Sequence, residues 1–480
     1  MDGRTNSTQL AVIGGGPGGY GAAFMAADLG LRVALIDLEP NPGGVCLYRG
    51  CIPSKALLHV AKVIGESRQA TNWGITFSEP RIDLEKLRAW KDGVVNKMTG
   101  GLGQLSKLRN IAFIRGRAEF LDSRTLKIEG RDGERRMVFD NAIIATGSRP
   151  AAPRALSLDS PRILDSTAAL ELADIPKTML VIGGGYIGLE LGTVYAALGT
   201  QVSVVEMTSG LLPEVDRDLV LILARHLDQI FHSVMLNARA VEMKEEKNGV
   251  RVRIEGAEIG GDEAIYERVL VAAGRAPNSG GLGLEKTKVI VDARGFVQVD
   301  AARRTADPAI YAIGDVAGEP MLAHKATHEG RVAAEAISGR AVAFEPRAIP
   351  AVVFTDPEVA WCGLTESQAK EEGRPVKVAR FPWGASGRAA TLDRGDGVTK
   401  LIIDPESERV LGVGISGPGA GELIAEGVLA VEMGAVASDI ELSIHPHPTL
   451  SETLMESAET FFGRSTHFYR AKTGRAAASE

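Results

Sequence analysis

The feature that most restricts how this chain can fold is a segment of about thirty residues that occurs twice. LAVIGGGPGGYGAAFMAADLGLRVALIDLE occupies residues 10–39, and LVIGGGYIGLELGTVYAALGTQVSVVEM occupies residues 180–207. Each copy has an apolar run, a glycine-rich turn, a helical pattern and a second apolar run that ends at an acid. The first glycine and that acid are 23 residues apart in both copies. The pattern predicts a strand, a tight turn, a helix and a second strand in both places.

The conserved spacing of these glycines within the two copies has a separate physical reason at each position. The first glycine permits the tight turn, the second lets the backbone approach a pyrophosphate, and the third lets the helix pack against the strand. The terminal acid accepts hydrogen bonds from ribose hydroxyls. In the two copies these residues are Gly14, Gly16, Gly19 and Asp37, and Gly183, Gly185, Gly188 and Glu206. Two dinucleotide-binding units are therefore predicted, although turns without a ligand remain the alternative.

The second unit also carries a signal about which nicotinamide nucleotide it binds. MTSGLLPEVD, which follows Glu206, contains no Arg or Lys. A basic side chain is what a 2′-phosphate would need at this position. The sequence therefore predicts NAD rather than NADP.

Length and charge agree with a multidomain globular protein. The chain has 480 residues, enough for about three folding units. Lys and Arg number 54 against 61 Asp and Glu, so nothing favours binding to nucleic acid or an anionic membrane. The polar start MDGRTNSTQL predicts neither a signal peptide nor a membrane span. Three cysteines in so long a chain indicate a reducing compartment, and we expect the cytoplasm.

The rest of the chain suggests how these units are completed. DNAIIATGSRP (140–150) and ERVLVAAGRAPN (267–278) are a second pair of similar segments, each an apolar strand followed by a turn. Another strand is expected to stop at Gly314 and Asp315, which places a carboxylate at a ligand-binding sheet edge. From about Ile349, alternating apolar runs and a helical stretch predict an antiparallel sheet with helices. The tail from Ala471 is expected to be loose.

The segment GGVCLYRGCIPSK (43–55) holds two of the three cysteines. Zinc is disfavoured, because His59 is the only further ligand nearby and structural zinc needs four. Residues five apart on a regular helix have Cα atoms about 8 to 9 Å apart, beyond the limit of about 7 Å for a disulfide. A disulfide between Cys46 and Cys51 therefore requires a distorted backbone before the helix, which the neighbouring glycines allow. Inert packing remains the alternative.

Several motifs in order resemble the FAD-dependent pyridine nucleotide-disulfide oxidoreductases, and most closely the branch that oxidises dihydrolipoyl groups. Besides the cysteine segment they are AIIATGSRP, GGGYIGLELGTVY, AAGRAPN, YAIGDVAGEPMLAHKA, FTDPEVAWCGLTE and HPHPTLSE. The resemblance runs from about Gln9 to Gly463. It implies an α/β fold with two Rossmann-like dinucleotide-binding domains and a C-terminal α+β dimerisation domain. The predicted limits are 1–150 for the FAD-binding domain with the cysteine pair, 151–280 for the NAD-binding domain, 281–348 for a central domain and 349–480 for the interface domain.

The same resemblance assigns the cofactor-binding residues. The first glycine unit would hold FAD, with Asp315 and the backbone near Ala323 completing the site, and the second unit would hold NAD. Lys55 and Glu190 would lie beside the flavin, although Glu190 taken alone predicts an ordinary surface carboxylate. The remaining residues that the resemblance implies at the cofactor sites are Gly44, Ala118, Gly147, Tyr186 and Gly274.

The resemblance also assigns the chemistry. Cys51 would face the flavin, Cys46 would exchange with substrate, and His447 would be the base, oriented by Glu452. His447 would come from the other subunit, which makes the protein an obligate homodimer. The implied reaction oxidises protein-bound dihydrolipoyl groups with NAD⁺, and the partners would be the lipoyl domains of 2-oxoacid dehydrogenase acyltransferases or the glycine cleavage H protein. The alternatives are a glutathione-reductase-like enzyme that uses NADPH and a slow-turnover flavoprotein redox sensor.

Three positions depart from the pattern of that family. Tyr48 and Arg49 stand where Asn-Val is common, and they predict extra bulk and positive charge between the cysteines, with an effect on redox poise or substrate access. Tyr186 replaces an aliphatic residue, and Asp37 replaces a glutamate with a longer reach.

Overall fold

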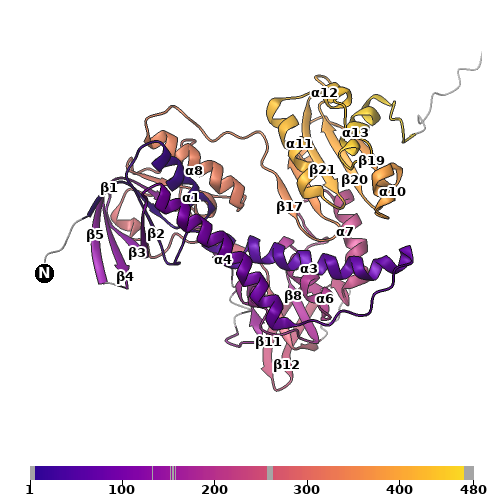
Figure 1. Cartoon of the computed structure of the whole chain (residues 1–480), viewed down its shortest axis with the longest axis horizontal. Helices are drawn as coiled ribbons and strands as arrows, with labels where there is room; N and C mark the ends of the chain where they lie inside the picture. The colour runs from indigo at the N-terminus through magenta and orange to yellow at the C-terminus, as the bar shows by residue number, and fades with distance from the viewer. Residues whose placement is uncertain are drawn as a thin grey trace, which may run out of the picture.

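The computed structural model describes residues 6–131, 133–151, 153, 156, 158–256 and 263–469. The tail predicted from Ala471 lies outside these ranges. Figure 1 shows an N-terminal sheet at the left, a second group of strands below the centre, and the C-terminal part as a lobe at the upper right. The long helix α3 (Cys51–Gln69) extends from the centre of the molecule beneath that lobe. No helix within the described ranges is long and apolar enough to cross a membrane.

The first glycine unit lies in a six-stranded sheet. Its first strand β1 pairs in parallel with β2 on one side and with β5 on the other. The order is β1-β2-β3-β4-β5-β16, with bounds Asn6–Ile13, Val33–Asp37, Ala112–Asp122, Thr125–Gly130, Gly133–Ile144 and Ile310–Ala312. Helix α1 (Pro17–Asp28) packs against α8 (Ala323–Ile337) beside this sheet, as Figure 1 shows. The strand at 310–312 therefore joins the first sheet although it follows the second unit in sequence.

The second glycine unit lies in a five-stranded parallel sheet. Its order is β10-β9-β8-β14-β7, with bounds Ser233–Met235, Gln201–Val205, Thr178–Ile182, Arg268–Val271 and Ile163–Leu164. An antiparallel sheet of β11 (Ala238–Glu246), β12 (Gly249–Gly256) and β13 (Glu263–Tyr266) lies next to it. The two similar segments at 140–150 and 267–278 take equivalent places in the two sheets. The first contains the end of β5, which lies beside β1, and the second contains β14, which lies beside β8. Their continuations β6 (Ser148–Pro150) and β15 (Arg275–Pro277) pair with each other.

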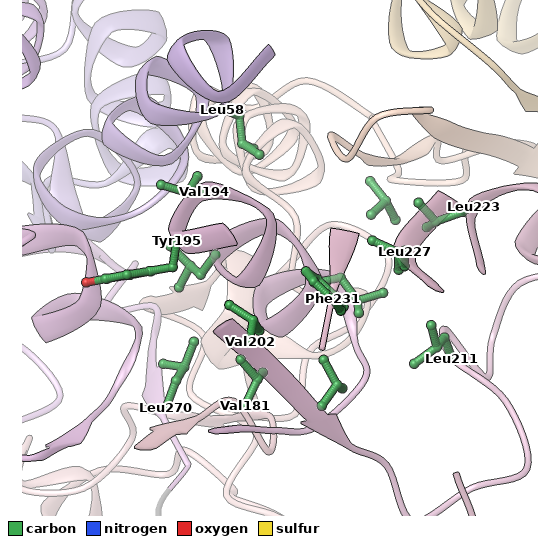
Figure 2. Close-up of a cluster of buried hydrophobic side chains, with 14 of the residues drawn as sticks. Leu58, Val181, Val194, Tyr195, Val202, Leu211, Leu223, Leu227, Phe231 and Leu270 are labelled. Carbon is green, nitrogen blue, oxygen red and sulfur yellow. The ribbon is translucent and has the colours of Figure 1, made fainter. Parts of the chain in front are cut away.

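The helix that begins with Cys51 is anchored in the core of the second unit. Figure 2 shows Val181, Val202 and Leu270 from the sheet packed beneath Val194 and Tyr195 of α6 (Tyr186–Ala197). Leu58 of α3 belongs to the same buried cluster, and so do Leu223 and Leu227 of α7 (Arg217–Ile230). Burying a leucine side chain stabilises the folded state by about 2 kcal/mol. The packing of α3 therefore fixes the cysteine segment relative to the second glycine unit.

The C-terminal lobe is the predicted antiparallel sheet with helices. Its order is β17-β18-β21-β20-β19, with bounds Ala351–Val353, Val359–Gly363, Val410–Ser416, Val398–Ile403 and Lys377–Pro382. The helices are α9 (Glu366–Glu371), α10 (Gly387–Thr391), α11 (Ala420–Met433), α12 (Ala437–Leu442) and α13 (Glu452–Phe462). Trp383 is fully buried in this lobe, and its Nε1 donates to Thr399 Oγ1 at 2.9 Å. The four domain limits given above stay predictions.

A buried group of charges joins the second unit to the lobe. Lys400 on β20 is 1% exposed, and its Nζ lies 2.7 Å from Asp216, 2.8 Å from Asp218 and 2.6 Å from Glu366. Asp216 also accepts the backbone N–H groups of Glu366 and Ser367 at the start of α9. Because a buried charge needs compensating partners, these contacts fix how the two parts dock.

Candidate active site

A cavity of about 640 Å³ lies where the first glycine turn, the cysteine segment and the start of α6 converge. Thirteen residues predicted for the site line it, namely Gly14, Gly16, Asp37, Gly44, Cys46, Cys51, Lys55, Ala118, Gly147, Tyr186, Glu190, Asp315 and Ala323. The other predicted residues do not line it, namely Gly19, Gly183, Gly185, Gly188, Glu206, Gly274, His447 and Glu452. The structure therefore brings the FAD and dithiol residues together and places the second glycine turn and the His–Glu pair elsewhere.

The first glycine turn has the close contacts that a pyrophosphate-binding loop needs. Gly14 has φ +104°, and a Cβ there would lie 2.2 Å from the Ala145 carbonyl oxygen. A Cβ on Gly19 would lie 1.8 Å from the Gly14 carbonyl oxygen, so this glycine allows the helix to pack on the strand. Helix α1 begins directly after Gly16, and its free N–H groups are a site for an anion. These features fit the pyrophosphate of FAD.

The two acids are held in the same way in both units. One oxygen of the Asp37 carboxylate accepts the Gly15 N–H, and the other accepts the Glu39 N–H at 2.8 Å. Glu206 accepts the Gly184 N–H and the Thr208 N–H, both at 2.7 Å. Burial raises the pKa of Asp37, although these N–H groups oppose the rise. The backbone thus fixes the orientation of each carboxylate.

The second glycine turn repeats the geometry of the first. Gly183 has φ +111°, and a Cβ there would lie 2.5 Å from the Ala272 carbonyl oxygen. A Cβ on Gly188 would lie 2.3 Å from the Gly183 carbonyl oxygen. Gly185 has open space beside it and directly precedes α6. Gly274, with φ +113°, follows the neighbouring strand β14 and is open in the same way.

Arg217 is the first basic residue after Glu206 in the sequence. Its guanidinium donates to the Leu211 carbonyl at 2.7 Å and also to the carbonyls of Leu212 and Val215. These hydrogen bonds hold the loop that follows the strand. They also keep the guanidinium from serving as a free cation for a 2′-phosphate.

The two cysteines do not share one regular helix, as the disulfide geometry required. Cys46 lies in the short helix α2 (Gly44–Arg49), and Cys51 is the first residue of α3. Gly50 separates the two helices with φ −145° and ψ −118°. Both thiols are free in this structure, and they are hydrogen-bonded to each other. The backbone break between the helices is what allows the sulfur atoms to approach.

The two thiols have different acidities. The hydrogen bond from Cys46, and then the charge of Lys55, lower the pKa of Cys51 to about 7. The pKa of Cys46 is raised, first because its thiol donates to Cys51 and then because of burial. Cys51 is therefore the thiol of the reduced pair that ionises first as the pH rises, and the N-terminus of α3 stabilises its thiolate further.

Lys55 and Glu190 form the ion pair that the resemblance implied. Lys55 Nζ lies 2.7 Å from Glu190 Oε2 and 4.6 Å from the centre of the Phe354 ring. Glu190 Oε1 accepts the Phe354 N–H at 2.9 Å. Glu190 is 3% exposed, so the surface carboxylate suggested by its position alone is wrong. The cysteine helix, α6 and the start of the C-terminal lobe meet at this pair.

Asp315 is supported by residues that the sequence reasoning missed. Ser148 Oγ donates to the Asp315 carboxylate, and Arg275 Nε donates to Ser148 Oγ at 2.7 Å. On the other side, the Gly314 N–H donates to the fully buried Glu329 at 2.6 Å. Glu329 also pairs with Lys325 Nζ at 3.0 Å. Lys325 and Glu329 are four residues apart on α8, a spacing that places them on the same face of that helix.

His447 and Glu452 form an imidazole–carboxylate pair on the C-terminal lobe. His447 Nδ1 lies 2.9 Å from Glu452 Oε1, and Glu452 Oε2 accepts the Thr449 N–H at 2.7 Å. Burial would raise the Glu452 pKa, but the Thr449 N–H and His447 hold it below its ordinary value. The His447 side chain is 70% exposed. His445, by contrast, has Nε2 2.8 Å from Glu426 and Nδ1 2.8 Å from the Ser443 carbonyl.

Comparison with known proteins agrees with this geometry. A family model described as pyridine nucleotide-disulphide oxidoreductase matches residues 8–330, and the model of its dimerisation domain matches residues 349–458. Dihydrolipoyl dehydrogenase from Vibrio cholerae is 48% identical over 464 residues, which is 97% of this chain and 98% of that protein. The Haemophilus influenzae protein of the same name is 50% identical over 466 residues, 97% of each chain. The crystal structure of LpdA from Mycobacterium tuberculosis has a TM-score of 0.88 and 28% identity, and the match covers 94% of this chain and 99% of that one.

The chain therefore belongs to the pyridine nucleotide-disulphide oxidoreductases, a class of flavoprotein. Within that class, the Vibrio cholerae and Haemophilus influenzae relatives, which match it over almost their whole length, are dihydrolipoyl dehydrogenases, a family that uses FAD and NAD(H). The match to the dimerisation domain supports a homodimer.

Proposed function

We propose that this chain oxidises dihydrolipoyl groups carried by other proteins and transfers the electrons to NAD⁺. The observation that carries the proposal is the pair Cys46 and Cys51, with separated acidities, inside the cavity that the first glycine turn also lines. The high identity to full-length dihydrolipoyl dehydrogenases supports the same substrate. The NADPH-dependent and sensor alternatives have no comparable support.

The two glycine units would hold the two cofactors. Gly14, Gly16 and Asp37, together with Asp315, would bind FAD, and Gly183 and Glu206 with their neighbours would bind NAD. Bound there, FAD would supply the two-electron and hydride chemistry that links the dithiol to NAD⁺. Lys55 and Glu190 would place a fixed, compensated charge pair beside the flavin. The stretch MTSGLLPEVD after Glu206 contains no Arg or Lys, and Arg217 that follows it donates to backbone carbonyls, which supports NAD.

The thiol chemistry follows from the different roles of the two cysteines. In the oxidised enzyme, a substrate thiolate attacks the Cys46 sulfur, a new S–S bond forms, and the bond to Cys51 breaks. Cys51 leaves as a thiolate, which its pKa of about 7 favours. The second substrate thiolate then displaces Cys46 and closes the lipoyl disulfide. Two electrons pass from the substrate to the cysteine pair.

His447 would take the proton from the attacking substrate thiol on its Nε2, with Glu452 holding the imidazole by its Nδ1. The pair lies on the C-terminal lobe and does not line the cavity of its own chain. The exposed imidazole would therefore serve the cysteines of a second subunit. This arrangement makes the homodimer the catalytic unit.

The substrate would arrive on a partner protein, because a dihydrolipoyl group is a flexible arm on a lipoyl domain. Lipoyl domains of 2-oxoacid dehydrogenase acyltransferases and the glycine cleavage H protein are the proposed partners. The cytoplasm is the proposed location, in keeping with the bacterial relatives.

The proposal is tested by following NADH formation from dihydrolipoamide and NAD⁺. We expect Cys46→Ser and Cys51→Ser to abolish it, and His447→Gln to lower the rate by about 10² to 10⁴. Cys362→Ser is the matched control, because Cys362 is buried in the C-terminal lobe and should leave turnover intact. Turnover that survives in either cysteine variant would exclude the dithiol mechanism. A preference for NADPH in the wild type would favour the glutathione-reductase-like alternative.

A further inference from the structure

The loop at residues 38–43 forms part of the wall of the cofactor cavity. It joins Asp37, at the end of β2, to the short helix α2 that carries Cys46. Leu38 and Glu39 line the same cavity as the thiols and the first glycine turn. Movement of this loop away from the glycine turn would open the side of the cavity next to the ribose-binding acid.

Tyr48 holds this loop from the far end of α2. Its hydroxyl accepts the Asn41 N–H and donates to the Asn41 carbonyl, both at 3.2 Å. The ring lies against Gly43, because its Cε2 is 3.1 Å from where a Cβ on Gly43 would stand. Tyr48 does not line the cavity. It therefore acts on the loop rather than on anything bound in the cavity.

Arg49 holds the loop at a second point. Its Nη2 forms an ion pair with Glu39 Oε1. The Glu39 N–H donates to the Asp37 carboxylate at 2.8 Å. The ion pair therefore holds in place the residue whose N–H orients the proposed ribose-binding carboxylate. The arginine side chain is 39% exposed and that of Glu39 is 19% exposed, so solvent screens the pair only in part.

The thiols are not the partners of these two side chains. The cation that affects the pKa of both Cys46 and Cys51 is Lys55, and Arg49 does not appear among the main influences on either. The positive charge that the sequence placed between the cysteines is directed at Glu39 instead.

We propose that Tyr48 and Arg49 form a clamp that holds the 38–43 loop against the first glycine turn and slows the release of FAD. The inference rests on the proposed function, because it takes this cavity to be the FAD site. Two neighbouring residues of α2 thus tie the loop at Glu39 and Asn41, while the Gly43 N–H donates to the Gly15 carbonyl at 2.7 Å. Opening the loop requires all of these contacts to break.

The test measures FAD release from the purified holoenzyme by the rise of flavin fluorescence in mild denaturant. Loss of a neutral hydrogen bond changes an equilibrium about five-fold, so Tyr48→Phe should speed release by about that factor. Arg49→Met should speed it about two- to five-fold, because its ion pair is partly screened, and since Arg49 also lines the cavity, Tyr48→Phe is the variant that tests the clamp alone. The control is Arg109→Met, which removes another arginine–carboxylate pair, with Asp28 at 2.9 Å, outside the cavity lining. Its release rate should equal that of the wild type.

A second measurement separates the clamp from an effect on the thiols. The pH profile of thiol alkylation in the reduced protein should have the same midpoint in Arg49→Met and the wild type. A raised midpoint with unchanged FAD release would overturn the clamp. Unchanged release in both variants would also overturn it, and the proposed function would stand. A wild-type protein that neither contains nor takes up FAD would overturn both.

Discussion

Replacing Lys55 with methionine should raise the pKa of Cys51. Cys51 and Lys55 are the first and fifth residues of α3, so about 6 Å separates them along the helix axis. At an effective dielectric constant of 20, a unit charge at that distance contributes about 3 kcal/mol, which corresponds to about 2 pKa units. Glu190 shares the ammonium at 2.7 Å and reduces its effect on the thiolate. We therefore expect a rise of about 1 to 2 units from the value of about 7.

The assay is the pH dependence of iodoacetamide alkylation of the reduced protein, with mass spectrometry to identify the modified cysteine. Above its pKa Cys51 is a thiolate and reacts, so the midpoint for Lys55→Met should move to between about 8 and 9. The control is Lys62→Met, eleven residues along the same helix and about 16 Å away, beyond the screening length of physiological salt. A midpoint that stays near 7 in Lys55→Met would refute the electrostatic account of the thiol pair.

Two further predictions concern the second unit and its junction with the C-terminal lobe. Glu206→Ala should weaken NAD⁺ binding about five- to tenfold in a fluorescence titration, because it removes the oriented ribose acceptor, and equal affinity would contradict that role. Lys400→Met should lower the free energy of unfolding by about 3 kcal/mol in denaturant titrations, because it leaves the buried Asp216 carboxylate without its cation, whereas Asp218 and Glu366 are partly exposed and keep Arg380. Lys127→Met, at a partly exposed ion pair between neighbouring strands, should change it far less. Burial would raise the pKa of Asp216, but Lys400 holds this pKa below its ordinary value of 3.8. The stability that the wild-type pair contributes should therefore be present above pH 3.8 and be lost as the pH falls further.

The sequence alone determined the parts of the site that depend on neighbouring residues. The glycine turns, the acids 23 residues on and the break between the two cysteines all follow from local backbone geometry, because a tight turn and a helix start are decided within a few residues. The structure repeats the same N–H contacts at Asp37 and Glu206 because the strand–turn–helix–strand spacing is the same in both units. The antiparallel sheet that begins near Ile349 was equally predictable, because the alternation of apolar and polar residues along its strands is visible in the sequence itself.

Only the tertiary structure decided which charges are buried and paired. Glu190 is 135 positions from Lys55, and Ser148 is 167 positions from Asp315, so no local pattern relates them. A carboxylate on a helix face has the same sequence signature whether that face meets water or another domain. The desolvation that makes Glu190 part of the site, and the contacts that direct Arg49 to Glu39 rather than to the thiols, arise from how the sheets and helices dock.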